Sequence, residues 1–356
     1  MPTLEEIKSA LSTVQEPELH RDVVSLGMIK NVSHDNGAVH VTLELTTPAC
    51  PLKDELRQRI ETAVGKLSGV KKVDVEFTAR VAQARPVTGK MPIEGVKNVI
   101  AVYACKGGVG KSTVAVNIAT ALAARGAKVG LLDADIYGPN IPLMMGASGR
   151  PEGSGENKIA PLVAHGVKLM SLGFLTDAKT PMIWRGPMVH GALQQLLRET
   201  DWADLDYLIV DLPPGTGDAQ LTLIQSVPLA GVIFVSTPQA VSLADGVKGI
   251  EMFKKLDVPI LGIVENMSGF KCPDCGHVTN IFSRGGAEAE AAHYGIPFLG
   301  AVPLEAEVVT SGDTGRPIVL SHPESAAAVA FTHMAELAAA QVSVAQFEKG
   351  AVPIAP

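Results

Sequence analysis

A glycine-rich segment, Lys106-Gly107-Gly108-Val109-Gly110-Lys111-Ser112, follows an apolar run at residues 98–104 and precedes a helical stretch. Such a turn exposes successive backbone N–H groups, which form a concave anion site with the start of the next helix. Lys111 is then placed for the β- and γ-phosphates and the Ser112 hydroxyl for Mg²⁺. The alternative is a glycine-rich turn that binds nothing. Because strand, Gly-Lys-Ser and helix come in the required order, we predict a phosphate-binding loop.

The loop departs from the G-x-x-x-x-G-K-[ST] pattern where Cys105 stands in place of the first glycine. Only a positive φ would demand glycine, so we expect Cys105 to keep a negative φ. The loop residues expected to contact the nucleotide are Cys105, Lys106, Gly107, Gly108, Val109, Gly110, Lys111, Ser112 and Thr113.

From residue 96 onward, apolar strand-like runs alternate with helical stretches. The runs are residues 98–104, 129–132, 207–210, 231–236, 260–264 and 298–302. Strands that are apolar on both faces predict an α/β fold, with a mostly parallel sheet flanked by helices. Ligands of such sheets lie at the carboxyl ends of the strands. A Rossmann dinucleotide fold is the competing α/β interpretation, but no G-x-G-x-x-G follows the first strand.

The first 80 residues predict a small α+β domain. Apolar spacing favours helices at 4–14 and 52–67, and Asn36-Gly37 supplies the positive φ of a hairpin turn before a strand at 73–77. We therefore predict domains at 1–80 and 97–345, a Pro- and Gly-containing linker at 81–96 and a tail at 346–356.

Composition excludes several classes of protein. With 356 residues, 46% of them hydrophobic, the chain can bury a large core, and a net charge of −7 argues against a broad nucleic-acid surface. The start does not read as a signal peptide, and the longest apolar runs are far short of a membrane span. Four cysteines do not make a disulfide framework in a chain of this length. These features predict a cytoplasmic protein with neither nucleic acid nor membrane as partner.

Three carboxylates follow apolar strands. Asp133 and Asp135 end the second strand, and we assign Asp133 to the neighbourhood of Mg²⁺ and Asp135 to orienting the attacking water. Either one is alternatively a helix cap. Asp211 fits a Walker B position that holds Mg²⁺ through water, and the following loop, 212–218, is suited to sensing a γ-phosphate. Lys106, Lys111 and Asp135 are the predicted catalytic residues.

A second chemical signal is the Cys-x-x-Cys pair Cys272 and Cys275. Two such thiolates hold one corner of a metal site, yet a complete site needs about four ligands and the chain offers no second pair. A homodimer whose two-fold axis joins both pairs would make an S₄ site for zinc or an iron–sulfur cluster. A zinc knuckle and a redox disulfide are the alternatives.

Residues 106–112 resemble the deviant Walker A motif of the MinD/ParA/nitrogenase-iron-protein class, which carries an extra lysine near the start of the loop. Within that class the chain resembles the Mrp/ApbC iron–sulfur cluster carriers over residues 97 to about 320. The supporting segments are residues 133–139, 184–188, 211–218, 265–268 and 272–276. The N-terminal unit is similar to the small domain attached to many of these carriers and found alone in iron–sulfur maturation factors, with residues 47–51 matching its reactive-cysteine segment.

The resemblance implies an ATP-dependent homodimer in which Lys106 reaches across the interface to the nucleotide of the other subunit. It also implies that paired Cys272 and Cys275 bind a bridging [4Fe–4S] cluster and that Asn266 helps to recognise the adenine. Cys50 becomes a candidate functional thiol, the alternative being a cysteine packed inertly at a helix start.

Two functions are therefore expected to compete. The leading hypothesis is a carrier that assembles a labile [4Fe–4S] cluster and passes it to apoproteins, using ATP binding or slow hydrolysis to switch the dimer between conformations. The rival is a zinc-stapled dimeric MinD/ParA-type positioning ATPase. Such proteins usually need a basic amphipathic tail, whereas residues 341–356 contain one lysine.

Overall fold

The computed structural model describes residues 2–84, 87, 89–136, 138–155, 158–175, 186–215, 217–348 and 350. Contacts divide the chain into two units, Met1–Ala82 with Ala339–Pro356, and Gln83–Ala338. The domain limits predicted from the sequence, at residues 80, 96 and 345, remain a proposal. Of the segments that carried the family resemblance, Tyr137, Trp184, Arg185 and Thr216 lie outside the described residues.

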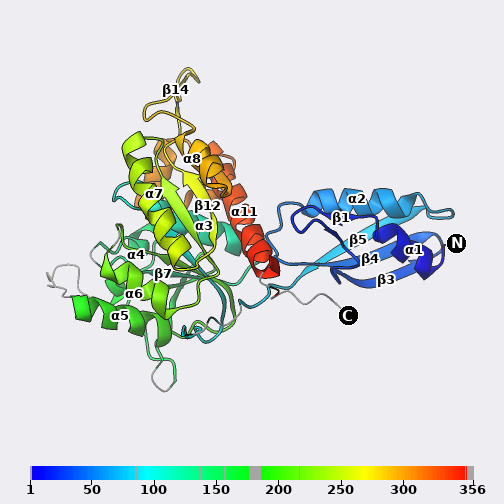
Figure 1. The fold of residues 1–356 in the computed structure, drawn as a ribbon, viewed down its shortest axis with the longest axis horizontal. Helices are drawn as coiled ribbons and strands as arrows, with labels where there is room; N and C mark the ends of the chain where they lie inside the picture. The colour runs from blue at the N-terminus through cyan, green and yellow to red at the C-terminus, as the bar shows by residue number, and fades with distance from the viewer. Residues whose placement is uncertain are drawn as a thin grey trace. The chain divides into compact units, whose positions relative to one another are not determined.

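The first unit packs two helices on a three-stranded sheet (Figure 1). Helix α1 (Leu4–Leu11) starts in a capping box between Thr3 and Glu6. Strands β3 (Ile29–Asp35) and β4 (Ala38–Leu45) form the predicted hairpin, and Asn36 and Gly37 have φ of 51° and 88°. After α2 (Lys53–Gly65), β5 (Lys72–Ala79) pairs parallel to β4. A short ribbon is formed by β1 (Gln15–Glu16) and β2 (Arg21–Asp22).

The second unit contains a large sheet, as the alternation of apolar and helical segments predicted. Its strands are β6 (Val96–Tyr103), β7 (Val129–Asp133), β8 (Leu162–Ala164), β9 (Val167–Ser171), β10 (Leu205–Asp211), β11 (Gly231–Ser236), β12 (Ile260–Glu265) and β15 (Phe298–Ala301). Its helices are α3 (Lys111–Ala124), α4 (Ile141–Met144), α5 (Gly186–Arg198), α6 (Asp218–Ser226), α7 (Ala240–Lys255), α8 (Gly286–Tyr294), α9 (Ala306–Asp313) and α10 (Ile318–Ser321), with a 3₁₀ turn, η1 (Leu172–Phe174), after β9.

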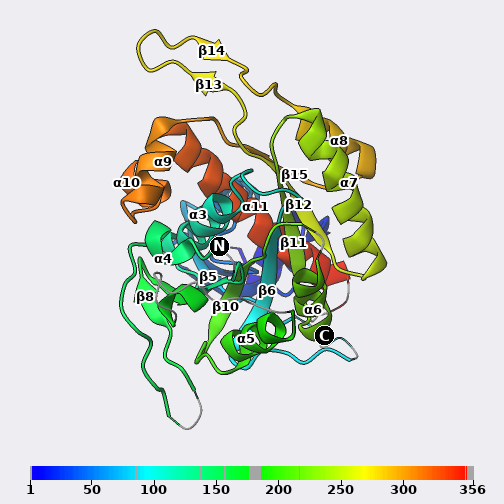
Figure 2. The ribbon, with the colours of Figure 1, turned by 90° about the vertical axis from the view of Figure 1, so that its left-hand side faces the viewer.

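The strand order is β15-β12-β11-β6-β10-β7-β9-β8, and every pair in it is parallel except β8 with β9. Helices lie on both sides of the sheet, with α3 and α4 on one side and α7 and α8 on the other (Figure 2). The sequence did not predict β8 and β9. They are short and joined by a tight turn at His165 and Gly166, with φ of 52° and 77°, so they lack a long apolar run.

The last helix, α11 (Ala326–Glu348), begins in the second unit. Among the described residues it is the one helix long and apolar enough to span a membrane by length and composition. More than half of that stretch, 56%, is buried inside the protein, as in the core helix of a folded domain.

Candidate functional site

The topology brings the sequence motifs to one edge of the large sheet. Strand β6 lies between β10 and β11, and its carboxyl end leads into the loop that starts α3. The carboxyl ends of β7, β10 and β12, which carry Asp133, Asp211 and Glu265, lie at the same edge because these strands are parallel to β6. This is the edge at which open α/β sheets bind ligands.

The phosphate loop has the backbone that its glycines predict. Gly108 and Gly110 have φ of 80° and 84°, and no positive φ occurs at Cys105, which confirms the expectation for that residue. A Cβ on Gly110 would lie 2.0 Å from Asn266 Nδ2, whereas a Cβ on Gly107 would meet nothing within 4 Å. Gly110 is therefore required by both backbone conformation and packing.

Lys111, Ser112 and Asp211 meet below the loop. Lys111 Nζ lies 2.5 Å from Asp211 Oδ1, and the Ser112 hydroxyl donates to Asp211 Oδ2 at 2.6 Å. Burial raises the pKa of the Asp211 carboxyl, while the Lys111 ammonium and the Ser112 hydroxyl act in the opposite direction. A hydroxyl beside a carboxylate is an oxygen donor set that suits Mg²⁺. The structure thus brings together the residues proposed for the metal and for the β- and γ-phosphates.

A hollow of about 420 Å³ opens above these residues. Its floor is formed by Asp135, Asn140 and the loop residues Lys106, Gly107, Gly108, Gly110, Lys111, Ser112 and Thr113. The described residues that complete its wall are mostly apolar: Leu143, Met144, Pro214, Asn266, Met267, Pro303, Leu304, Glu305, Val308, Val309, Gly312 and Asp313. A polar floor and an apolar wall match the phosphates and the base of a nucleotide.

Asp133 does not line this hollow. Its side chain is 1% exposed and accepts hydrogen bonds from Asp135 N, Ile141 N and Ser171 Oγ at 3.0–3.2 Å. Burial, with the nearby Asp211 charge, raises the pKa of the Asp133 carboxyl to about 7. In this structure Asp133 fixes the loop after β7, and of these two aspartates it is Asp135 that reaches the hollow.

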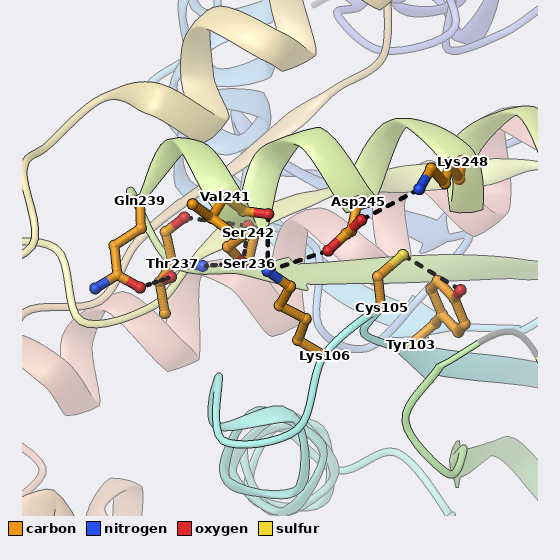
Figure 3. A network of polar contacts seen from close by, with 10 residues as sticks. All are labelled: Tyr103, Cys105, Lys106, Ser236, Thr237, Gln239, Val241, Ser242, Asp245 and Lys248. Carbon is orange, nitrogen blue, oxygen red and sulfur yellow. Dashed lines mark hydrogen bonds and ion pairs between the residues drawn. The ribbon is translucent and has the colours of Figure 1, made fainter.

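Lys106 contacts helix α7 of its own chain (Figure 3). Its Nζ lies 3.1 Å from Asp245 Oδ2 and donates to the Val241 carbonyl at 3.1 Å. The hydrogen bond and charge of Lys106 lower the pKa of the Asp245 carboxyl. Cys105 points away from the phosphate side, since its Sγ contacts the Tyr103 hydroxyl at 3.3 Å and lines a small apolar cavity beneath α7. Burial raises the pKa of the Cys105 thiol.

The cysteine pair lies on a separate projection. After β12 the chain extends into a small hairpin of β13 (Phe270–Lys271) and β14 (Val278–Thr279), seen at the top of Figure 2. Cys272 is half-buried and Cys275 is exposed. The backbone N–H groups of Cys275 and Asp274, and then the Cys275 side chain, lower the pKa of the Cys272 thiol. A lowered pKa favours the thiolate, the form that binds metals.

Cys50 belongs to the first unit, where it is half-buried against the core of that unit. Within the described residues no cluster of three or more His, Cys, Asp or Glu that could hold a metal ion occurs. The neighbouring thiols of Cys272 and Cys275 lie together on the projecting hairpin.

Comparison with known proteins gives this site its family. A family model described as NUBPL iron-transfer P-loop NTPase matches residues 95–339. The chain belongs to this family. A second model, described as iron-sulfur cluster assembly protein, matches residues 4–77, so both parts of the predicted resemblance are confirmed.

Individual relatives agree with the assignment to this NTPase family. The chain is 50% identical over 350 residues to an "Iron-sulfur cluster carrier protein" of Synechocystis, covering 97% of this chain and 99% of the relative. A nucleotide-binding protein from Archaeoglobus fulgidus, solved in complex with ADP, is 39% identical over 63% of this chain and 88% of its own, with a TM-score of 0.56. The cell division ATPase MinD of Pyrococcus furiosus shares the fold, at 23% identity, 67% and 97% coverage and a TM-score of 0.51.

Sequence reasoning about this NTPase missed two side chains near the site. Asp245, the partner of Lys106, follows no motif and lies in the middle of α7. Glu265 stands inside a segment that carried the family resemblance, but no role was assigned to it. Its signal was visible, because an acidic residue directly after an apolar strand points to the ligand edge of a sheet.

Proposed function

We propose that this NTPase is an ATP-dependent carrier that holds a [4Fe–4S] cluster between two copies of the chain and delivers it to apoproteins. The observation that carries the proposal is the Cys272 and Cys275 pair, which lies on a projecting hairpin in the same unit as a phosphate-binding loop. A cluster at an accessible position is suited to release. The name of the Synechocystis relative, iron-sulfur cluster carrier protein, supports the same cargo.

The cysteine count supports a dimer. An iron–sulfur cluster needs four thiolates, and Cys272 and Cys275 supply two per chain. A two-fold axis beside the hairpin would bring four sulfurs together in an isologous interface. The cluster is cargo in this scheme, so the exposed Cys275 is where a recipient would approach it.

The nucleotide site is proposed to bind MgATP. The backbone N–H groups of residues 107–113 and the Lys111 ammonium would hold the phosphates, while Ser112 and Asp211 would hold Mg²⁺. Asp135 and Asn266 line the hollow, and we assign Asp135 to orienting the attacking water and Asn266 to recognising the adenine. Hydrolysis is proposed to be slow, with ATP acting mainly as a conformational switch.

Lys106 is proposed to reach the nucleotide of the second subunit. To do so its ammonium has to leave Asp245 and the Val241 carbonyl. The side chains of Lys106 and Asp245 are each 36% exposed. Solvent weakens an ion pair this exposed, so a phosphate group can replace it. We place the protein in the cytoplasm with apoproteins as partners, without nucleic acid or membrane, and keep Cys50 as a candidate thiol.

Anaerobic reconstitution with iron and sulfide tests the carrier function. We expect the wild-type protein to acquire the visible absorption of a [4Fe–4S] cluster, and the double variant Cys272→Ser/Cys275→Ser to acquire none. Cys50→Ser is the matched control and should load normally. Stoichiometric zinc with no cluster would instead favour the positioning ATPase.

A further inference from the structure

Glu265 is a buried carboxylate to which the proposed function gives no task. It ends β12, its side chain is fully buried, and no ion pair found among the described residues includes it. Burying a carboxylate without a cation is costly unless strong hydrogen bonds hold it. The contacts that compensate this cost indicate what Glu265 does.

Three donors converge on Glu265. Its Oε1 accepts from the Ser268 hydroxyl at 2.6 Å and from Gly285 N at 2.8 Å, and its Oε2 accepts from Ala287 N at 2.8 Å. A carboxylate accepts hydrogen bonds at both oxygens. Glutamine has an NH₂ group in place of one oxygen, so this donor would face another donor. The site therefore specifically requires an acceptor-only side chain.

These donors bracket the cysteine hairpin. Ser268 lies immediately before residues 269–284, which contain β13, Cys272, Cys275 and β14, and Gly285 lies immediately after them. One carboxylate thus joins both ends of the projection to each other and to the start of α8. Met267 and Ser283 have positive φ of 58° and 76°, so the backbone at both ends is strained and needs such support.

The next residue, Asn266, contacts the nucleotide loop. Its Nδ2 donates to the Val109 carbonyl at 2.9 Å, and its side chain packs on Gly110. Leu304 makes a second connection. Its N–H donates to the Gly269 carbonyl at 2.8 Å, and the same residue lines the nucleotide hollow. Glu305 lines both this hollow and a second one beside Cys272.

We propose that Glu265 is a positioning residue that couples the nucleotide pocket to the cysteine hairpin. Movement of the phosphate loop on nucleotide binding would displace Asn266, which contacts this loop. The hydrogen bonds of the neighbouring Glu265 carboxylate would then transmit the displacement to both ends of residues 269–284. The proposal rests on the proposed function, because it describes how nucleotide would regulate the cargo thiols.

Hydrogen exchange and thiol labelling test this coupling in the full-length apoprotein. Exchange in residues 269–284 and the alkylation rates of Cys272 and Cys275 are measured by peptide mass spectrometry, with and without MgADP or MgATP. In the wild type we expect nucleotide to change these rates by about threefold or more, an opening free-energy change of roughly 0.6 kcal/mol. In Glu265→Gln we expect nucleotide affinity within about threefold of wild type but no nucleotide effect on the hairpin.

Ser268→Ala is the milder variant, since it removes one donor and keeps the carboxylate. It should reduce the nucleotide effect without abolishing it, and it keeps the test decisive if Glu265→Gln does not fold. The coupling would be overturned if the wild-type hairpin did not respond to nucleotide, or if Glu265→Gln kept the full response. If Glu265→Gln does not fold, a full response in Ser268→Ala would overturn it instead. A variant that loses nucleotide affinity in step with the hairpin response would also overturn it. Failure of the wild type to load a cluster is a separate result, which would refute the carrier function.

Discussion

At the scale of single residues, the phosphate loop is fixed by contacts that its own sequence does not contain. Gly110 is held in a left-handed conformation with Asn266 against it, although the two are far apart in the chain. Lys111 and Asp211 form a buried pair although they are 100 residues apart in the chain. Substitutions at different glycines of this loop should therefore lower the free energy of unfolding by very different amounts.

Gly110→Ala should destabilise the second unit strongly, and Gly107→Ala is its matched control. The new Cβ at position 110 would overlap Asn266 at a positive φ, which costs about 1–3 kcal/mol, whereas the one at position 107 meets open space and should cost less than about 0.5 kcal/mol. Both tryptophans lie within the range of the second unit, so urea unfolding followed by tryptophan fluorescence reports this difference. Equal losses in the two variants would contradict the packing argument.

Lys111→Ala should abolish ATP turnover and also leave the buried Asp211 carboxylate without its cation. We expect a loss of about 3 kcal/mol in the free energy of unfolding, because removing one member of a buried pair leaves an uncompensated charge. Adding Asp211→Asn should recover much of the stability but none of the turnover. Full turnover in Lys111→Ala would show that the phosphate loop is wrongly assigned.

At the scale of elements, Asp133 ties three segments together. It ends β7 and accepts hydrogen bonds from Ser171 at the end of β9 and from Ile141 at the start of α4. The sequence predicted a carboxylate near Mg²⁺ at this position. Because β9 was not predicted, the neighbour that removes Asp133 from the hollow was not foreseen either.

The raised pKa of Asp133 predicts a pH dependence of stability. The folded protein holds its proton up to about pH 7, while an unfolded aspartic acid releases it near pH 4, so this group stabilises the fold increasingly as pH falls between these values. Relative to Asp133→Asn, the wild type should gain about 1–3 kcal/mol between pH 8 and pH 5. Urea unfolding at both pH values checks this, and a difference that stays constant with pH would contradict it.

At the scale of the whole molecule, the proposed dimer rests on the number of thiols in each chain. Each chain supplies one projecting pair, Cys272 and Cys275, and the family and its relatives associate such chains with iron–sulfur clusters. In the proposed function, four-thiolate ligation by this pair takes two chains for each cluster. The oligomeric state and the metal content should change together.

A reconstituted wild-type sample should contain about two iron ions per chain and run as a dimer by light scattering. Cys272→Ser/Cys275→Ser should lose the iron, and Cys105→Ser should keep it because that thiol lies beneath α7. Four iron ions per chain in a monomer would contradict the shared site.

The sequence alone determined the class of the fold and predicted the chemistry that is proposed for this protein. The phosphate loop is a local motif, the cysteine pair is defined by its spacing, and strands buried on both faces are long apolar runs, so each can be read from adjacent residues. The family that these residues predicted is confirmed by the match over residues 95–339.

Only the tertiary structure decided which side chains support that chemistry. It placed Lys106 on Asp245, turned Cys105 away from the phosphates, buried Asp133 beside Ser171 of β9 and joined Glu265 to both ends of the cysteine hairpin. The physical reason is the strand order, which puts β6 beside β10 and β11 and so brings distant parts of the chain to one edge. Contacts made across that edge leave no periodicity or spacing in the sequence.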